Sequence, residues 1–186
     1  MTTYISMLRG INVSGQKLIK MDALRKLYEQ LGFQNVTTYV QSGNVIFTDI
    51  DPDYKMLENK ISVKIEKDFE FYVPVIVLTI DILKQITDNN PFLKDSDKDP
   101  TFLYVTFLTS KPDLYDYKQI EDKKQNGEEI FFSDHAVYLY CPNGYGRTKL
   151  NNNFLEAKLK VGATTRNWRT TNELLKIAQQ IKPIPQ

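Results

Sequence analysis

Glycines and basic residues gather in the segment 8–17, which reads LRGINVSGQK. Arg9 precedes Gly10, Gly15 follows five positions later, and Lys17 comes two residues after that. A Walker A loop binds nucleotide phosphates through the pattern GxxxxGK followed by Ser or Thr. In this chain the lysine stands one position late, and no hydroxyl residue follows it to contact magnesium. The segment is therefore not a P-loop, although its residue types still suit a bound anion.

Two further segments place basic residues where a helix is expected to begin. GYGRTK covers residues 144–149 and TTRNWRT covers residues 164–170. Cations beside the free N–H groups of a helix start cost stability unless an anion joins them. The sequence therefore predicts an anion site at three basic helix starts, with Lys17 and Lys20 leading into the first. The predicted ligand-binding residues are Arg9, Gly10, Asn12, Gly15, Lys20, Gly144, Gly146, Arg147, Lys149, Thr165, Arg166, Asn167 and Trp168.

The residue types in this set suggest how each would act. The glycines would let backbone N–H groups approach the ligand closely. Trp168 would stack on a base or ring, or serve only in core packing, and the sequence leaves both interpretations open.

A second polar set, Gln41, Ser42 and Asn44, stands in YVQSGNV, where it fits either a second site or ordinary turn chemistry. We expect this hairpin and the 8–17 loop to lie at opposite ends of the sheet.

Catalytic and metal sites find little support. Cys141 and His135 are the only residues of their types, and six residues of strand would separate them by roughly 20 Å. They cannot form a nucleophile–base pair, so we expect a buried, unreactive Cys141 and assign no catalytic residue. One Cys and one His also exclude the usual zinc ligand sets. The acidic run 95–99 lacks the glycine that a calcium loop requires, so neither a metal nor a cofactor is predicted.

These residues must be positioned by elements that the hydrophobic pattern predicts. The first half reads as a strand, a helix, a hairpin turning at Ser42-Gly43, a helix and a strand, the ferredoxin-like βαββαβ order. The predicted ranges are 3–9, 21–31, 35–41, 44–48, 53–67 and 73–80, followed by a short helix at 81–88. A polar stretch at 89–101 then reads as a linker.

The second half repeats this scheme without strong sequence identity. The predicted elements are a strand at 101–108, a helix at 111–124, a hairpin at 128–141 turning at Ser133-Asp134, a helix at 148–161 and a last helix at 171–181, capped by Thr170 and Glu173. The fold class is therefore α+β with two subdomains. Residues 1–88 form the ferredoxin-like one and residues 102–186 a related βαββα arrangement with an extra C-terminal helix.

Charge and composition limit the function classes. The chain has 186 residues and a net charge of +1, which argues against a strong nonspecific polyanion binder. The charge is +2 over residues 1–50, −7 over 51–140 and +6 over 141–186, so a fold that joins the two ends would create a local positive field. No membrane-spanning segment and no secretory signal are expected, and a single cysteine fits a reducing cytoplasm.

Several functions remain open at this stage. The first is binding of an anionic ligand, a phosphorylated small molecule or a nucleotide, at the basic helix starts. The alternatives are an RNA or single-stranded DNA module that stacks bases on tyrosines and Trp168 of a sheet face, and an enzyme of unidentified reaction. A purely structural or interaction protein is the last. No membrane partner is expected, and the oligomeric state is not predicted.

The segments LRGINVSG, TYVQSGNVIF, NPF and TTRNWRT resemble the signatures of a bacterial family known as domain of unknown function sixteen ninety-seven. The resemblance covers essentially the whole chain. It implies two α+β subdomains, the first similar to a ferredoxin-like unit, and brings no established activity, substrate or catalytic residue. The chain departs from the family pattern at Ser14, where glycine is common, and at Arg169, where asparagine is common.

Overall fold

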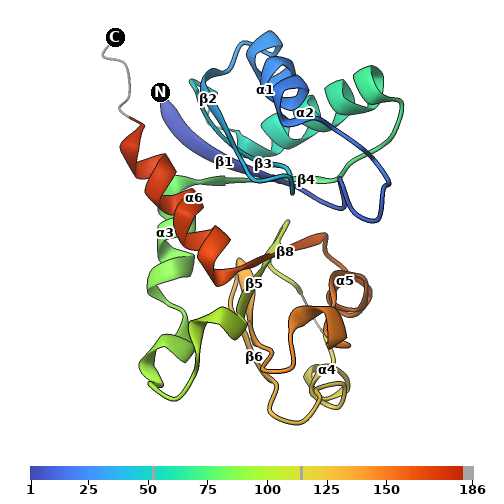
Figure 1. The fold of residues 1–186 in the computed structure, drawn as a ribbon, viewed down its shortest axis with the longest axis vertical. Helices are drawn as coiled ribbons and strands as arrows, with labels where there is room; N and C mark the ends of the chain where they lie inside the picture. The colour runs from blue at the N-terminus through green and yellow to red at the C-terminus, as the bar shows by residue number, and fades with distance from the viewer. Residues whose placement is uncertain (52, 114, 182–186) are drawn as a thin grey trace. The chain divides into compact units, whose positions relative to one another are not determined.

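The computed structural model describes residues 1–51, 53–113 and 115–181. The chain divides into two compact units, each with one four-stranded antiparallel sheet (Figure 1). The first unit comprises Met1–Lys84 and the residues from Glu173 onward, which the sequence-based division grouped with the second subdomain; the second unit is Gln85–Asn172. The predicted α+β class with two subdomains is confirmed.

The first unit has the predicted βαββαβ order. Its elements are β1 (Thr2–Leu8), α1 (Met21–Gln30), β2 (Gln34–Tyr39), β3 (Asn44–Asp49), α2 (Tyr54–Phe69) and β4 (Val75–Thr79). The strands lie in the order β2-β3-β1-β4, and every neighbouring pair is antiparallel. Both helices cover the same face of this sheet (Figure 1). This is the strand order of a ferredoxin-like sheet, with β1 at its centre.

Apolar side chains at helical and strand spacing build the core of this unit. Leu24 and Leu27 of α1 and Ile61 of α2 are buried against Tyr4 and Phe47 of the sheet. The hydroxyl groups of Ser6 and Tyr28 hydrogen-bond at 2.7 Å within this core. Edge strand β2 is irregular, because its pairing with β3 shifts between Gln34 and Thr37, where Asn35 has φ +52°.

The second unit contains one strand more than predicted. Its elements are β5 (Leu103–Leu108), α4 (Tyr117–Glu121), β6 (Glu129–Phe132), β7 (Ala136–Tyr140), α5 (Asn152–Leu159) and β8 (Ala163–Asn167). The order β6-β7-β5-β8 repeats that of the first sheet. The hydrophobic pattern does not predict strand β8, because its sequence, ATTRN, contains a single apolar residue. Strand β8 pairs with β5 from Leu108 to Tyr104. The second unit therefore also has the βαββαβ order.

Helix boundaries in the second unit differ from the predicted ones. The helix expected over 111–124 is only α4, and the one expected from residue 148 begins at Asn152, where the Asn151 side chain caps it. The last helix, α6 (Trp168–Gln180), begins three residues early. The Asn167 side chain accepts a hydrogen bond from the Thr170 backbone N–H at 2.8 Å, so Asn167 caps this helix and the predicted Thr170–Glu173 box does not.

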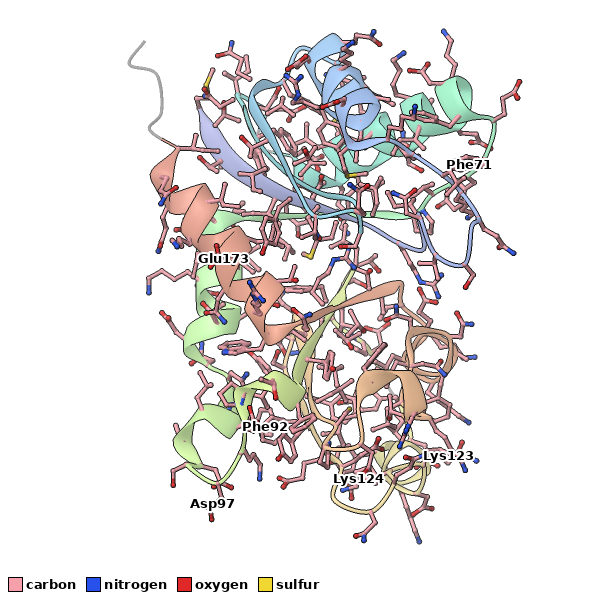
Figure 2. All side chains as sticks on the ribbon, in the orientation of Figure 1. Phe71, Phe92, Asp97, Lys123, Lys124 and Glu173 are labelled. Carbon is pink, nitrogen blue, oxygen red and sulfur yellow. The ribbon has the colours of Figure 1, made fainter. Side chains whose placement is uncertain are left out.

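The stretch that reads as a linker is ordered. It follows α3 (Ile80–Asp88) and contains two short 3₁₀ turns, η1 (Pro91–Lys94) and η2 (Pro100–Phe102). Asn90 caps η1 by accepting from the N–H of Phe92, which is labelled in Figure 2. The Phe92 ring centroid lies 6.5 Å from that of Tyr140. The NPF segment is thus a capped turn with an aromatic anchor. None of the described helices is long and apolar enough to cross a membrane.

Candidate functional site

The loop between β1 and α1 adopts a tightly defined conformation. Its backbone φ is positive at Gly10, Asn12, Ser14, Gly15 and Lys17, at +46° to +74°. Left-handed conformation costs a residue with a side chain roughly 1–2 kcal/mol, so contacts with the surroundings must hold three of these residues in place. Hydrogen bonds from Asn12 N to the Lys17 carbonyl and from Gln16 N to the Val13 carbonyl close a miniature hairpin. Its exposed tip is Ser14-Gly15.

Asn12 connects this loop to its surroundings. Its Nδ2 donates to the carbonyl oxygens of Ile19 at 2.9 Å and Gln41 at 2.8 Å, and its Oδ1 accepts from the Ile19 N–H at 2.9 Å. Lys17 Nζ donates to the Tyr72 carbonyl at 2.7 Å. Asn12, a predicted ligand-binding residue, therefore serves to hold the loop against the 41–44 hairpin, and its side-chain amide is already occupied.

The predicted separation of the loop from the hairpin is wrong. Strands β1 and β2 are both antiparallel to β3, so they run in the same direction. Their C-terminal ends therefore lie at the same end of the sheet. Leu8 N donates to the Gly43 carbonyl at 2.8 Å, which joins the two segments directly. The proximity of the two segments follows from the strand order and directions of a ferredoxin-like sheet.

Within the hairpin, the polar residues mostly support the turn. Asn44 is buried, and its Nδ2 donates to the Tyr39 carbonyl at 3.1 Å and to Ser42 Oγ at 3.0 Å. Gln41 is exposed, and its carbonyl oxygen accepts from Asn12. Gly43 is required at its position, because an added Cβ would lie 2.7 Å from side-chain carbons of Leu8 and Ile11.

The start of α1 differs from the other helix starts. Lys20 is its N-cap residue, and no side chain caps the helix. Every other helix of eight or more residues in the described part of the chain begins with a side-chain oxygen on a first-turn N–H. The capping residues are Asp53 for α2, Thr79 for α3, Asn151 for α5 and Asn167 for α6.

The Lys20 side chain is exposed and forms no hydrogen bond or ion pair within the described ranges. Arg9 lies half-buried at the other end of the loop, and its backbone N–H donates to the Pro74 carbonyl at 3.0 Å. Asp22 in the first turn offsets part of the positive charge. Of the three predicted basic helix starts, the one at α1 is therefore present in the first unit, with Lys20 at the N-cap position.

The other two basic segments do not form open helix starts. Arg147 and Lys149 are exposed, but α5 begins only at Asn152 and is capped. Gly144 (φ +85°) and Gly146 belong to the 3₁₀ turn η3 (Tyr145–Arg147) and its approach. The predicted site residues therefore fall into two groups, one in each unit. Their joining into a single site stays a prediction.

In the second unit the structure does bring two predicted segments together. Tyr145 of η3 donates to Thr165 Oγ1 of β8 at 3.0 Å, and Thr165 donates to Asn152 Oδ1 of α5 at 2.6 Å. Thr106 Oγ1 lies 2.7 Å from Thr165 Oγ1 and must donate to it, because the single Thr165 proton is already used. Tyr145, Asn152 and Thr106 were missed because nothing marks β8 as a strand in the sequence.

Arg166 is buried in β8 and does not stand exposed before a helix. Its Nη1 donates to Thr164 Oγ1 and to the Thr165 carbonyl, each at 2.9 Å. Burial lowers the pKa of Arg166 to about 10, and the nearby Tyr145 opposes the shift. The guanidinium therefore stays charged at neutral pH, as a buried cation of strand β8.

Trp168 lines a surface hollow of about 270 Å³ together with Pro100, Thr101, Asn167 and Arg169. It is half-buried, and it is not a member of the described hydrophobic core cluster of this unit.

Cys141, by contrast, is fully buried, as predicted. Burial and then the charge of Glu128 raise the pKa of the Cys141 thiol to about 12, which makes it a poor nucleophile.

Comparisons with known proteins agree with this architecture and name no activity. The family profile described as "Protein of unknown function (DUF1697)" matches residues 1–138. A solved structure, that of the conserved bacterial protein SP0830 from Streptococcus pneumoniae, matches 95% of this chain and 98% of its own with a TM-score of 0.71. At 23% sequence identity this likeness concerns the fold alone. The comparison with curated proteins found no significant match.

Proposed function

Because the chain belongs to the DUF1697 family of proteins of unknown function, we propose its function from the site alone: it binds a small anionic ligand at the start of α1. The ligand class is a phosphorylated small molecule or a nucleotide. One observation carries the proposal, namely that α1 begins on exposed Lys20 with no side-chain cap. The unfilled N–H groups of a helix start and its dipole favour an anion there, and Lys20 adds a full positive charge.

The surroundings support a defined ligand position. The loop before α1 is held by three hydrogen bonds of the Asn12 side chain and by the Lys17–Tyr72 hydrogen bond. A site held in one conformation pays less ordering entropy when the ligand arrives. Gly10 and Gly15 are exposed, and the positions of added Cβ atoms there are open space, so a ligand can approach this backbone.

A nucleic acid bound to a sheet face is less well supported. RNA-binding ferredoxin-like domains stack bases on exposed aromatic residues of the sheet. In the first sheet, Tyr39 on edge strand β2 is a half-buried ring of the face opposite the helical core. The aliphatic residues of that face are at most 4% exposed: Ile5, Met7, Ile46, Ile76 and Leu78. In the second sheet the corresponding Val105, Phe107 and Tyr138 are at most 1% exposed. Among the described strand residues of this second-sheet face, the exposed ring is that of Phe131 on edge strand β6, so the face does not offer a row of exposed stacking rings.

The test is a thermal-unfolding screen with inorganic phosphate, glucose 6-phosphate and AMP. A ligand present at 100 times its Kd stabilises the native state by about 2.7 kcal/mol, which is readily measured as a rise in Tm. We expect Lys20→Gln to weaken binding about fivefold, the effect of one charge at a helix start. Lys26→Gln is the matched control, because Lys26 is exposed on the same helix beyond its first turn.

Two results would overturn the proposal. The first is no shift in Tm with any of the three anions. The second is an equal loss of affinity in Lys20→Gln and Lys26→Gln, which would reveal a general charge effect. Salt dependence separates the nucleic-acid alternative, since affinity for an oligonucleotide falls steeply with salt in proportion to the phosphates contacted.

A further inference from the structure

The only tryptophan of the chain lines a hollow in the second unit, where it takes no part in the described core cluster. We propose that this hollow binds a planar aromatic ring that carries an anionic group. The residues that line this hollow all belong to the second unit, and nothing in the argument depends on the function proposed for the start of α1. The ligand chemistry is shared by nucleotides and by aromatic carboxylic acids.

The aromatic part of the proposal rests on Trp168 and its neighbours. The hollow measures about 270 Å³, slightly below the usual range for a drug-sized ligand, and is bounded by Pro100 of η2 and Trp168 of α6. Proline and tryptophan both offer flat apolar surfaces. Stacking of a base on an aromatic side chain contributes about 1–3 kcal/mol, whichever base it is. A half-buried tryptophan at the rim of a small hollow is therefore suited to one ring.

The anionic part rests on polar groups that have no partner. The guanidinium of Arg169 is exposed and forms no hydrogen bond or ion pair within the described ranges. The Trp168 indole N–H likewise has no acceptor among the described residues. Both residues belong to the first turn of α6, where the helix dipole is positive. Two residues that line the hollow therefore carry available donors, and one of these donors, the guanidinium, is a cation.

The acidic neighbour of the hollow restricts where the anion lies. Asp99 accepts a hydrogen bond from the Thr101 N–H at 2.8 Å, and this bond lowers the pKa of Asp99. Its carboxylate is therefore charged at neutral pH, on the η2 side of the hollow. A ligand anion would be repelled from that side and attracted to Arg169. The structure thus orients the ligand, with its ring between η2 and α6 and its anion at Arg169.

Intrinsic fluorescence gives a direct test, because Trp168 is the sole tryptophan. The probes are AMP and 4-aminobenzoate, with adenosine as a ring without the anion and ribose 5-phosphate as an anion without the ring. We expect AMP, 4-aminobenzoate or both to quench the emission saturably, and the responding probe identifies the ligand source. Adenosine should bind more weakly, and ribose 5-phosphate should leave the emission unchanged.

Variants separate this site from the rest of the chain. Arg169→Gln should weaken the anionic probes about fivefold and leave adenosine unchanged. Arg147→Gln is the control, since Arg147 is an exposed arginine of the same unit that does not line the hollow. Titrations repeated in the Lys20→Gln background should give the same affinities, which distinguishes this site from the one at α1.

Three outcomes would overturn the inference. They are no quenching by either ring-bearing anion up to about 10 mM, equal quenching by ribose 5-phosphate, and an Arg169→Gln variant that binds like the wild type. Trp168→Phe should retain a flat ring and hence binding detectable by calorimetry, whereas Trp168→Ala should lose it. Circular dichroism on each variant verifies that α6 and the sheet remain folded.

Discussion

Strand β1 of the first unit and strand β5 of the second align with an offset of 100 residues. Tyr4 and Leu8 correspond to Tyr104 and Leu108, and each strand has a partner on both sides in its sheet. The backbone bonds at their ends correspond as well. Leu8 N donates to the Gly43 carbonyl at 2.8 Å, and Leu108 N donates to the His135 carbonyl at 3.0 Å. The two units therefore share a backbone plan down to individual hydrogen bonds.

Side chains depart from this plan at the last strand. Strand β4 reads VIVLT and strand β8 reads ATTRN, so that Leu78 corresponds to Arg166 and Val77 to Thr165. The first unit instead concentrates its unusual features in the loop before α1. The comparison teaches that the repeated sheet is set by backbone pairing and apolar alternation. The polar sites belong to each unit separately, which argues against two copies of one function.

The largest effect is expected at Gly43. Its carbonyl and that of His135 accept corresponding backbone hydrogen bonds in the two units, but Gly43 is closely packed. Gly43→Ala should destabilise the protein by about 3 kcal/mol, since an alanine there must adopt a left-handed φ and press against Leu8 and Ile11. Urea unfolding measures this loss. His135→Ala, at the corresponding but exposed position of the second unit, should cost less than about 0.5 kcal/mol. Comparable losses at both positions would remove the distinction between the two hairpins.

An intermediate effect is expected at Thr165 of β8, which takes the place of Val77 in β4. Thr165→Val installs the kind of residue that β4 has, and should cost about 2 kcal/mol because Asn152 and Tyr145 lose their partner. Thr165→Ser keeps the hydroxyl and should recover most of that stability. The measurement is the urea midpoint of both variants. A valine variant as stable as the wild type would mean that the hydroxyl network contributes nothing to folding.

The smallest effect is the contribution of Cys141, in the second unit, to the pH dependence of stability. The pKa of the Cys141 thiol is raised to about 12 in the folded chain, above its unfolded value. This contribution is complete below the unfolded pKa and is lost as pH rises from about 9 toward 12, because the unfolded state releases its proton first. Cys141→Ala should therefore show a shallower loss of stability between pH 8 and pH 10. Parallel curves for the two proteins would contradict the shift.

Hydrophobic spacing predicted the helices and strands of the first unit to within two or three residues, because Leu24, Ile61 and Phe47 carry the pattern. Strand β8 was not predictable in this way, since Thr165 hydrogen-bonds with Thr106, which is distant in sequence, and Arg166 is a charged residue that the fold buries. Helix starts were misplaced for a related reason. Asn151 and Asn167 cap α5 and α6, and only the fold decides which nearby polar residue supplies the capping oxygen.

The candidate site shows the same division. The positions of Lys20 and Gly43 could be recognised from their residue types, and the loop-to-hairpin contact follows from strand directions. The Thr165 network and the hollow at Trp168 depend on β8 and η2, so residues such as Tyr145 and Pro100 carried no signal in the sequence. Long-range pairing decides which polar residues meet, and a single sequence does not display that pairing.

The irregular β2 edge has a consequence for the motions of the first sheet. Central strand β1 is bonded on both sides, whereas β2 has one partner and loses register near Asn35. Amide protons of β1 should therefore exchange with solvent only on global unfolding, while those near Asn35 exchange through local opening. The same irregularity interrupts the row of backbone groups that another chain would need to extend the sheet, and so protects this edge from aggregation.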